Sequence, residues 1–163
     1  MKILIVDDDL EVVHSLGNAF TTLLRGYLVL TATSANQGLN FIKQERPDVI
    51  IMDVRLGPKS GMDLLEDYAP YFKDYRPGIV VITAYDDPKA KEKSEKLKVD
   101  AFLMKPLKKD VLFVAVLEAL RKQLESKIRS IDLALQGFKG RGNTSQQSKD
   151  ELAEKMKQRP KTD

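Results

Sequence analysis

The sequence predicts an α/β fold in which helices cover both faces of a parallel sheet. Short apolar runs alternate five times with stretches whose apolar residues recur at helical spacing, which is the order of β-α units in such a sheet. The run 49–52 is apolar at every position, as expected of a central strand that is buried on both faces. Polar residues follow several of these runs, at the sheet edge where open α/β folds bind ligands.

Five strands are expected, at 3–6, 27–33, 48–53, 79–83 and 101–104. The first helix carries apolar residues at helical spacing from Leu10 onward, and Gly26 closes it. Ser34 and Gln37 form a capping box that opens the second helix, which is expected to stop before Pro47.

The segment 54–60 is expected to be a loop, because a Gly-Pro pair punctuates it. The third helix should cover 61–75. Pro70 interrupts it and cannot donate a backbone hydrogen bond, so we expect a kink or an early end near Ala69. A fourth helix, dense in lysine and glutamate, should run over about 88–98, with a proline in its first turn.

The last helix begins near Lys109 and is expected to continue to Gln136, beyond the length that covers the sheet. Its apolar positions follow a coiled-coil-like spacing: Phe113, Leu117, Leu120, Leu124, Ile128, Ile131 and Leu135. We predict that the extension 125–136 pairs with a second copy; alternatively, it folds back on its own domain. Three glycines should end the helix, and 137–163 is expected to be a flexible polar tail in which 149–158 could form a short helix.

Length and composition limit the classes of protein to consider. With 163 residues, 42% of them hydrophobic and 31% charged, the chain fits one globular domain with an appendage. It has no cysteine, and the apolar run at its start is too short for a signal peptide, so we expect a cytoplasmic protein without a membrane span. The net charge of +3 comes from the segment 139–163, which is weak support for a nucleic-acid partner.

The polar residues at the predicted strand ends form the candidate site. They are the acids at 7–9 after the first strand, Asp53 after the third, Thr83 at the end of the fourth and Lys105 after the fifth. These ends share one edge of a parallel sheet, so the side chains can converge although they are far apart in sequence.

The residue types at this edge indicate phosphoryl transfer onto Asp53. Converging carboxylates repel one another, and Mg²⁺ removes that repulsion while binding to one or two of them. The ammonium of Lys105 can hold a phosphoryl oxygen, and the hydroxyl of Thr83 can donate to another. A carboxylate is an established covalent phosphate acceptor in proteins, and the transfer needs mainly positioning and charge neutralisation.

At 1–124 the chain resembles the receiver domain of two-component response regulators, a CheY-like family. The resemblance rests on the run 3–8, on Asp53 with Gly61 eight residues later, and on the pairs Thr83-Ala84 and Lys105-Pro106. It implies a doubly wound, flavodoxin-like sheet with five strands in the order 2-1-3-4-5 and five helices, the last of them extended here. One position departs from the pattern: the family often has proline four residues after the acceptor, where this chain has Gly57 followed by Pro58.

The resemblance also implies a role for each site residue. Asp53 would accept a phosphoryl group from a sensor histidine kinase, and Mg²⁺ would be the cofactor. The implied metal ligands are Asp53, Asp8, the backbone carbonyl of Arg55, and Asp7 through water. The implied phosphoryl contacts are Thr83, Ala84 and Lys105, with Lys105-Pro106 as a cis peptide. Thr83 and Phe102 would act as the switch that reshapes the face of the fourth helix, fifth strand and fifth helix for dimerisation or partner binding.

Several of these positions have a structural alternative. The acids at 7–9 could be a favourable helix start, and Phe102 could be an ordinary core residue. We read His14, the single histidine, as structural. Arg55 and Tyr85 each lie two residues past a site residue, and we hypothesise that their bulk hinders the water that removes the phosphoryl group.

The predicted function is a signalling switch that assists its own phosphorylation and dephosphorylation, and not an enzyme with a separate substrate. Alternatives are a receiver fragment of a larger transcriptional regulator, a small-molecule phosphatase with Asp53 as nucleophile, and a DNA-binding protein with a basic tail. Against the phosphatase, Arg55 stands where a second catalytic acid would be needed. The sequence identifies neither the kinase nor the output partner.

Overall fold

Five parallel strands form one sheet in the computed structural model, which describes the backbone of residues 1–72 and 75–157 and the side chains of residues 1–72 and 75–138. The strands are β1 (Lys2–Val6), β2 (Leu28–Ala32), β3 (Val49–Asp53), β6 (Gly78–Thr83) and β7 (Ala101–Met104). Their order in the sheet is β2-β1-β3-β6-β7, with every pair parallel. This is the predicted order 2-1-3-4-5, so the predicted fold class is confirmed.

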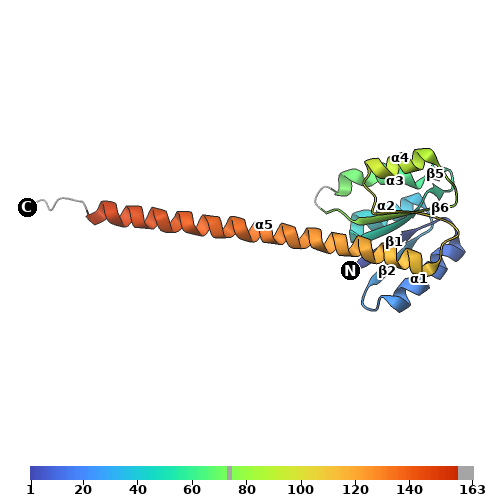
Figure 1. Ribbon diagram of the computed structural model, residues 1–163, viewed down its shortest axis with the longest axis horizontal. Coiled ribbons are helices and arrows are strands. Elements are labelled where there is room, and N and C mark those ends of the chain that lie inside the picture. Colours follow the sequence, from blue (N-terminus) through green and yellow to red (C-terminus); the bar gives the residue numbers. More distant parts are fainter. Residues whose placement is uncertain (73–74, 158–163) are drawn as a thin grey trace, which may run out of the picture. The chain divides into compact units, whose positions relative to one another are not determined.

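Helices lie on both faces of the sheet (Figure 1). They are α1 (Leu10–Leu23), α2 (Ala35–Glu45), α3 (Gly61–Tyr68) with a following 3₁₀ turn η1 (Ala69–Phe72), α4 (Pro88–Lys96) and α5 (Lys109–Lys157). One apolar cluster joins the sheet to α2, α3 and α4. A second cluster joins the opposite face to α1 and to the first turns of α5, where Leu112, Val116 and Leu120 are buried.

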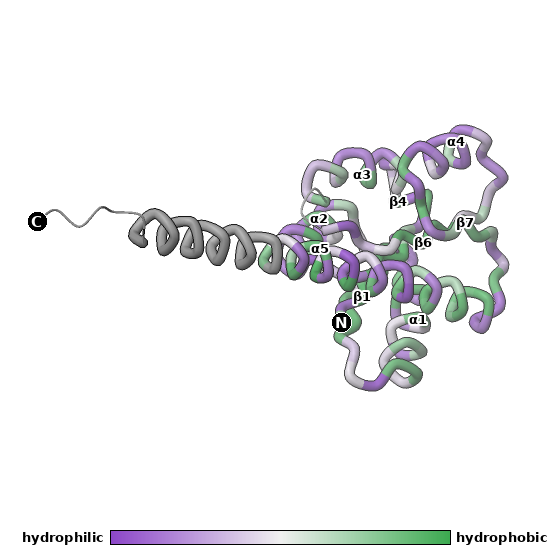
Figure 2. Tube along the Cα trace, turned by 60° about the vertical axis from the view of Figure 1, so that its left-hand side comes forward, coloured by the Kyte–Doolittle hydropathy of each residue, from purple (hydrophilic) through white to green (hydrophobic). Residues whose placement is uncertain are grey.

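The central strands are buried at every position, as the unbroken apolar runs predict. Along β3, Ile50 and Met52 belong to one cluster, whereas Val49 and Ile51 belong to the other. Burying each such side chain contributes about 1.5–3 kcal/mol, and a shift of one residue would exchange the two sets. The hydropathy of the chain shows the same division, with apolar strands inside and a mostly hydrophilic α4 outside (Figure 2). The packing therefore fixes where β3 ends, and with it the position of Asp53.

The helix starts follow the predicted capping chemistry. The Ser34 hydroxyl accepts a hydrogen bond from the Gln37 amide at 3.3 Å, and the Gln37 side chain accepts one from the Thr33 amide at 3.0 Å. Asp9 caps α1 by accepting from the amides of the first turn, and Asp87 does the same for α4. Such caps satisfy amides that have no partner inside the helix.

One connection confirms the expectation, and another differs from it in detail. The third helix ends early, as Pro70 predicts, because α3 stops at Tyr68 and η1 follows. The segment expected to be a simple loop instead contains two short antiparallel strands, β4 (Arg55–Leu56) and β5 (Lys59–Ser60). Gly57 lies at the turn between them with φ of 59°, a conformation that glycine adopts without steric cost.

The predicted end of the last helix at Gln136 was wrong, whereas the flexibility expected of the tail stays a prediction. The helix α5 continues to Lys157, and residues 158–163 lie outside the described part of the chain. A glycine inside a helix costs only about 1 kcal/mol relative to alanine, and residues 149–157 consist mostly of Lys, Glu, Leu, Ala and Met, which favour helix. Met1–Gln123 form one compact unit, and a second unit begins at Leu124. None of the helices in the described residues is both long and apolar enough to cross a membrane.

Candidate functional site

Asp53 is the last residue of β3, the middle strand of the sheet. It is only 8% exposed and lies at the carboxyl edge, where β1, β6 and β7 also end. Backbone hydrogen bonds hold Val54, the residue that follows Asp53. The Val54 amide donates to the Ile82 carbonyl at 2.9 Å, and the Gly61 amide donates to the Val54 carbonyl at 2.7 Å. A Cβ atom on Gly61 would lie 1.9 Å from the Asp53 carbonyl oxygen, so this contact requires glycine.

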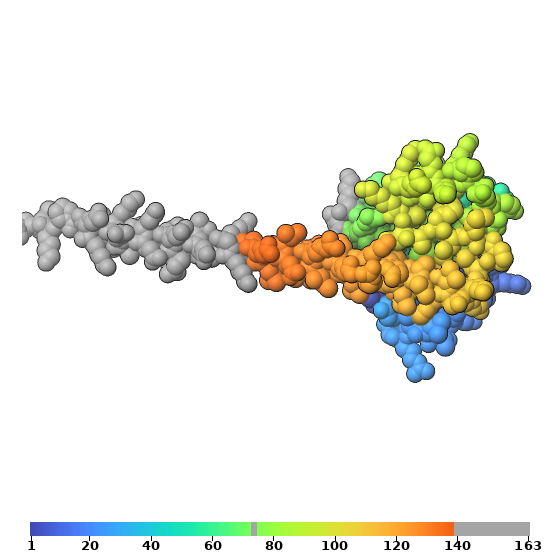
Figure 3. All heavy atoms as spheres, viewed as in Figure 1, coloured from blue at the N-terminus to red at the C-terminus, as the bar shows by residue number. Residues whose placement is uncertain are grey.

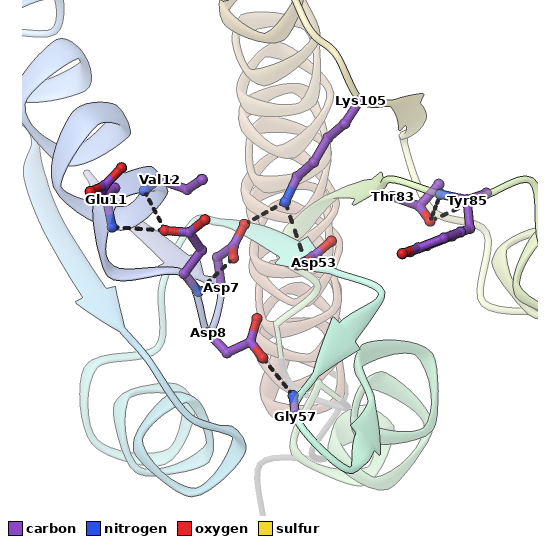
Figure 4. Close-up of polar contacts among 10 residues, drawn as sticks. Asp7, Asp8, Glu11, Val12, Asp53, Gly57, Thr83, Tyr85 and Lys105 are labelled. Atoms are coloured by element: carbon purple, nitrogen blue, oxygen red, sulfur yellow. Dashed lines mark hydrogen bonds and ion pairs between the residues drawn. The ribbon is translucent and has the colours of Figure 1, made fainter.

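Three carboxylates and one ammonium converge at this edge, as predicted (Figure 4). One oxygen from each of Asp7, Asp8 and Asp53 lies within 4.8 Å of the others. The Lys105 Nζ is 2.9 Å from Asp7 Oδ2 and 3.5 Å from Asp53 Oδ2, so this lysine bridges two of the acids. The peptide bond between Lys105 and Pro106 is cis, as expected.

The electrostatics of the cluster perturb both partners of the central ion pair. Burial and, to a lesser extent, the neighbouring charge of Asp7 raise the pKa of Asp53 to about 6, although the charge and hydrogen bond of Lys105 act in the opposite direction. Burial disfavours the Lys105 ammonium, but the hydrogen bond with Asp7 and the charges of Asp53 and Asp7 outweigh that effect and raise its pKa. One ammonium among three carboxylates leaves the cluster with excess negative charge.

The donor set fits a divalent cation. Carboxylate oxygens are the ligands that hard cations prefer, and a cation here would relieve the repulsion that raises the pKa of Asp53. Asp7 and Asp53 are buried, whereas Asp8 is exposed, so the site can be reached from solvent. The cluster is thus compatible with the predicted metal site formed by Asp7, Asp8 and Asp53.

Thr83 ends β6, next to β3, and is 1% exposed. Its hydroxyl donates to the Tyr85 carbonyl at 3.0 Å and accepts from the Tyr85 amide at 3.1 Å. Within the described part of the chain, no hydrogen bond joins this hydroxyl to Asp53, so Thr83 shares the sheet edge with the acids but contacts its own loop. Ala84 is exposed beside it.

Phe102, the predicted switch aromatic, is partly buried on β7. It packs against the apolar cluster that includes β6 and α4. Its position is compatible with either the switch role or the core role, and the switch remains a prediction.

Two contacts at the site join segments that are far apart in the sequence, and no sequence pattern predicts either of them. The Arg55 guanidinium carbon lies 3.6 Å from the centroid of the Tyr85 ring, a cation–π contact between β4 and the segment after β6. The Gly57 amide donates to Asp8 Oδ2 at 2.8 Å. Arg55 and Tyr85 are both among the predicted site residues, but their contact with each other was not predicted. The predicted metal ligation by the Arg55 carbonyl remains a prediction.

Comparison with known proteins gives a consistent result. The profile of the response regulator receiver domain family matches residues 3–117. The transcriptional regulatory protein GlrR of Escherichia coli (strain K12) is 32% identical over 122 residues, which make up 74% of this chain and 26% of GlrR. The chain therefore spans about a quarter of the length of that relative.

Two solved structures are similar as well. A response regulator receiver domain protein (CheY-like) from Methanospirillum hungatei JF-1 has a TM-score of 0.69 and 28% identity, covering 77% of this chain and 97% of its own. A response regulator protein from Burkholderia pseudomallei, solved with a phosphorylated aspartic acid, calcium ion and citrate, has a TM-score of 0.62 and 25% identity, covering 78% of this chain and 74% of its own.

Proposed function

Because the chain belongs to the response regulator receiver domain family, we propose that it is a phosphorylation-activated switch of a two-component system. Asp53 is the phosphoacceptor, and a sensor histidine kinase is the donor. The observation that carries this proposal is the convergence of Asp7, Asp8, Asp53 and Lys105 at one sheet edge. The relative from Burkholderia pseudomallei, with its phosphorylated aspartic acid and calcium ion, supports the same chemistry.

The transfer uses the carboxylate of Asp53 as nucleophile. One of its oxygens attacks phosphorus, the bond from phosphorus to the donor imidazole breaks, and the imidazole leaves with the electron pair. Mg²⁺ held by Asp8, Asp53, the Arg55 carbonyl and, through water, Asp7 would supply charge neutralisation. Lys105 holds one phosphoryl oxygen, and its charge favours the ionised, nucleophilic form of Asp53.

The phosphoryl group adds a charge of roughly −1.5 to −2 at neutral pH. We propose that this charge draws the Thr83 hydroxyl and the Ala84 amide toward Asp53. Thr83 would then lose its two hydrogen bonds to Tyr85. Phe102 turns inward into the space that Thr83 leaves, and the face formed by α4, β7 and α5 changes shape.

This face is the proposed output surface. Figure 3 shows one side of the molecule on which atoms of α4, of the segment around β7 and of the first turns of α5 are all visible. Met104 on β7 is 50% exposed there, and Val111 on α5 is 45% exposed. Lys93 of α4 forms ion pairs with Asp63 and Glu66 of α3, so a movement of α4 has to break or carry along these pairs.

Dimerisation through the second unit is part of the proposal. Four apolar side chains of α5 are between 42% and 59% exposed and recur at spacings of four, three and four residues: Leu124, Ile128, Ile131 and Leu135. This spacing places them along one side of a helix, the pattern by which two helices pair. We propose that the stripe pairs with a second copy.

Sedimentation velocity at several protein concentrations tests the dimer. The change Ile128→Ser should shift the protein toward monomer, because it removes a central stripe residue. Leu133→Ser is the matched control, since Leu133 is 68% exposed but lies outside the stripe. Wild-type protein that stays monomeric with and without a phosphoryl mimic would contradict the pairing.

A receiver fragment of a larger transcriptional regulator is the second candidate. The observation that favours it is the match to GlrR, of which the chain covers 26%. The two candidates share the same receiver chemistry and differ in the output partner.

Beryllofluoride with Mg²⁺ tests the switch. This phosphoryl mimic should shift the backbone NMR resonances of Thr83, Ala84, Phe102 and Lys105, and Asp53→Asn should abolish those shifts. Wild-type spectra that do not change, or equal changes in Asp53→Asn, would contradict the proposal.

A further inference from the structure

We propose that the backbone N–H of Gly57 is a positioning group that aims the Asp8 carboxylate at the cation site. The inference rests on the proposed function and adds a residue to its machinery. Gly57 has no side chain, so its contribution comes from the place where the β4–β5 hairpin holds its amide.

The hydrogen bond from the Gly57 amide to Asp8 Oδ2 is 2.8 Å long, and it joins residues 49 positions apart in the sequence. Within the side chains described for residues 1–72 and 75–138, it is the one hydrogen bond or ion pair that the Asp8 carboxylate makes. Asp7 differs in this respect, because it is 2% exposed, accepts from the Asp9 amide and pairs with Lys105. Asp8 is therefore the member of the acidic cluster whose orientation depends on a single contact.

Asp8 also has room to turn away from the cluster. It lines a hollow of about 300 Å³ between the start of α2 and the β4–β5 hairpin, and the lining includes the lysine at position 59. An exposed carboxylate without a fixed partner could rotate into this space, toward that cation and away from Asp53. The amide of Gly57 holds one carboxylate oxygen and leaves the other free (Figure 4).

The hairpin fixes the amide with respect to Asp53. Arg55 and Leu56 pair with Ser60 and Lys59, and the amide of Val54 before the hairpin bonds to the end of β6. Gly57 reaches the required backbone conformation with φ of 59°, and no atom lies within 4 Å of where its Cβ would be. The amide is thus held by secondary structure and not by a freely moving loop.

Hydrogen bonds to metal-binding carboxylates matter because they orient the ligand before the metal arrives. Removing such an outer contact typically weakens metal binding by about 10–100-fold. We therefore expect loss of the Gly57 N–H to weaken Mg²⁺ binding by about tenfold or more, with the three carboxylates unchanged.

The first experiment is an NMR titration of the unphosphorylated 163-residue chain with Mg²⁺. Gly57→Pro removes the N–H and, because its ring fixes φ at about −65°, also changes the turn that places this amide. Gly57→Asn keeps the N–H and tolerates positive φ better than other side chains do. We expect weaker binding in Gly57→Pro and binding close to that of the wild type in Gly57→Asn. Equal affinity of Gly57→Pro and wild type, or equal loss in both variants, would overturn the inference.

The second experiment uses the wild-type backbone and does not depend on how the proline variant folds. Exchange of the Gly57 amide hydrogen should be slow in Mg²⁺-saturated protein and about tenfold faster or more in Asp8→Ala. An equally fast exchange in both proteins would overturn the inference. Wild-type protein that binds no Mg²⁺ would instead contradict the proposed function itself, so the two failures are distinguishable.

Discussion

Replacing Arg55 or Tyr85 by alanine should shorten the lifetime of the phosphoryl group on Asp53. The two side chains come from β4 and from the segment after β6, and they stack with 3.6 Å between the guanidinium carbon and the ring centroid. Both residues lie two positions past a site residue, and we propose that the pair borders the entrance to Asp53. On this hypothesis, the pair hinders the water that hydrolyses the acyl phosphate.

The size of the effect follows from the energy of the contact. Tyr85 is 51% exposed, and a cation–π contact at an exposed site contributes about 0.5–1 kcal/mol. If the pair has to open for water to reach phosphorus, its removal should accelerate phosphate loss about two- to fivefold. The double variant should lose phosphate about as fast as either single one, because each change alone breaks the contact.

The assay is the decay of phosphorylated protein after removal of the phosphodonor, followed by intact-protein mass spectrometry. Tyr71→Ala is the matched control, because Tyr71 is 46% exposed and also contacts a cation, Lys43, but lies on η1 outside the acceptor cluster. This control should decay at the wild-type rate. Unchanged or slower phosphate loss in both Arg55→Ala and Tyr85→Ala would refute the reasoning.

Three further predictions concern charge and packing at the site. Asp53→Asn should stabilise the metal-free protein at pH 7 by about 1–2 kcal/mol, measured by urea unfolding in EDTA. The raised pKa of about 6 means that the wild type loses stability as the pH rises from about 4 to about 6, so this gain should vanish below pH 4. Lys105→Met should raise the pKa of Asp53 further, as seen by ¹³C NMR of its carboxyl group, because the charge of Lys105 lowers that pKa. Gly61→Ala should destabilise the protein by about 2–4 kcal/mol through the 1.9 Å approach to the Asp53 carbonyl. Gly137→Ala should be neutral or stabilising by up to about 1 kcal/mol, because no atom lies within 4 Å of the added Cβ. A lower free energy of unfolding for Gly137→Ala than for Gly61→Ala would be inconsistent with the described packing.

The sequence carried enough information to predict the sheet and the acceptor. Strands buried on both faces, such as 49–52, are unbroken apolar runs and can be recognised directly in the sequence. The ends of these strands bring Asp7, Asp8, Asp53 and Lys105 to one edge of the sheet. The site is predictable mainly because parallel strands end at the same edge of the sheet, so residues that are distant in the sequence become neighbours there. The early end of α3 could also be predicted, since proline acts on the backbone locally.

Features that depend on side-chain or loop contacts were not predictable in the same way. The hairpin over 55–60 and the bond from Gly57 to Asp8 arise where two loops meet, and neither loop has a periodic pattern. The stacking of Arg55 on Tyr85 depends on rotamers in two such loops. The continuation of α5 past Gly137 could not be predicted, because glycine typically ends a helix although its cost inside one is only about 1 kcal/mol.

Site mapping of phosphoryl incorporation tests the central claim most directly. The 163-residue chain is incubated with a small acyl phosphate, with and without Mg²⁺, and the modified residue is located by mass spectrometry after reductive trapping of the acyl phosphate. The account predicts one phosphoryl group per chain, on Asp53, only when Mg²⁺ is present. Incorporation at another residue, or labelling of Asp53 that is equally fast in EDTA, would contradict it.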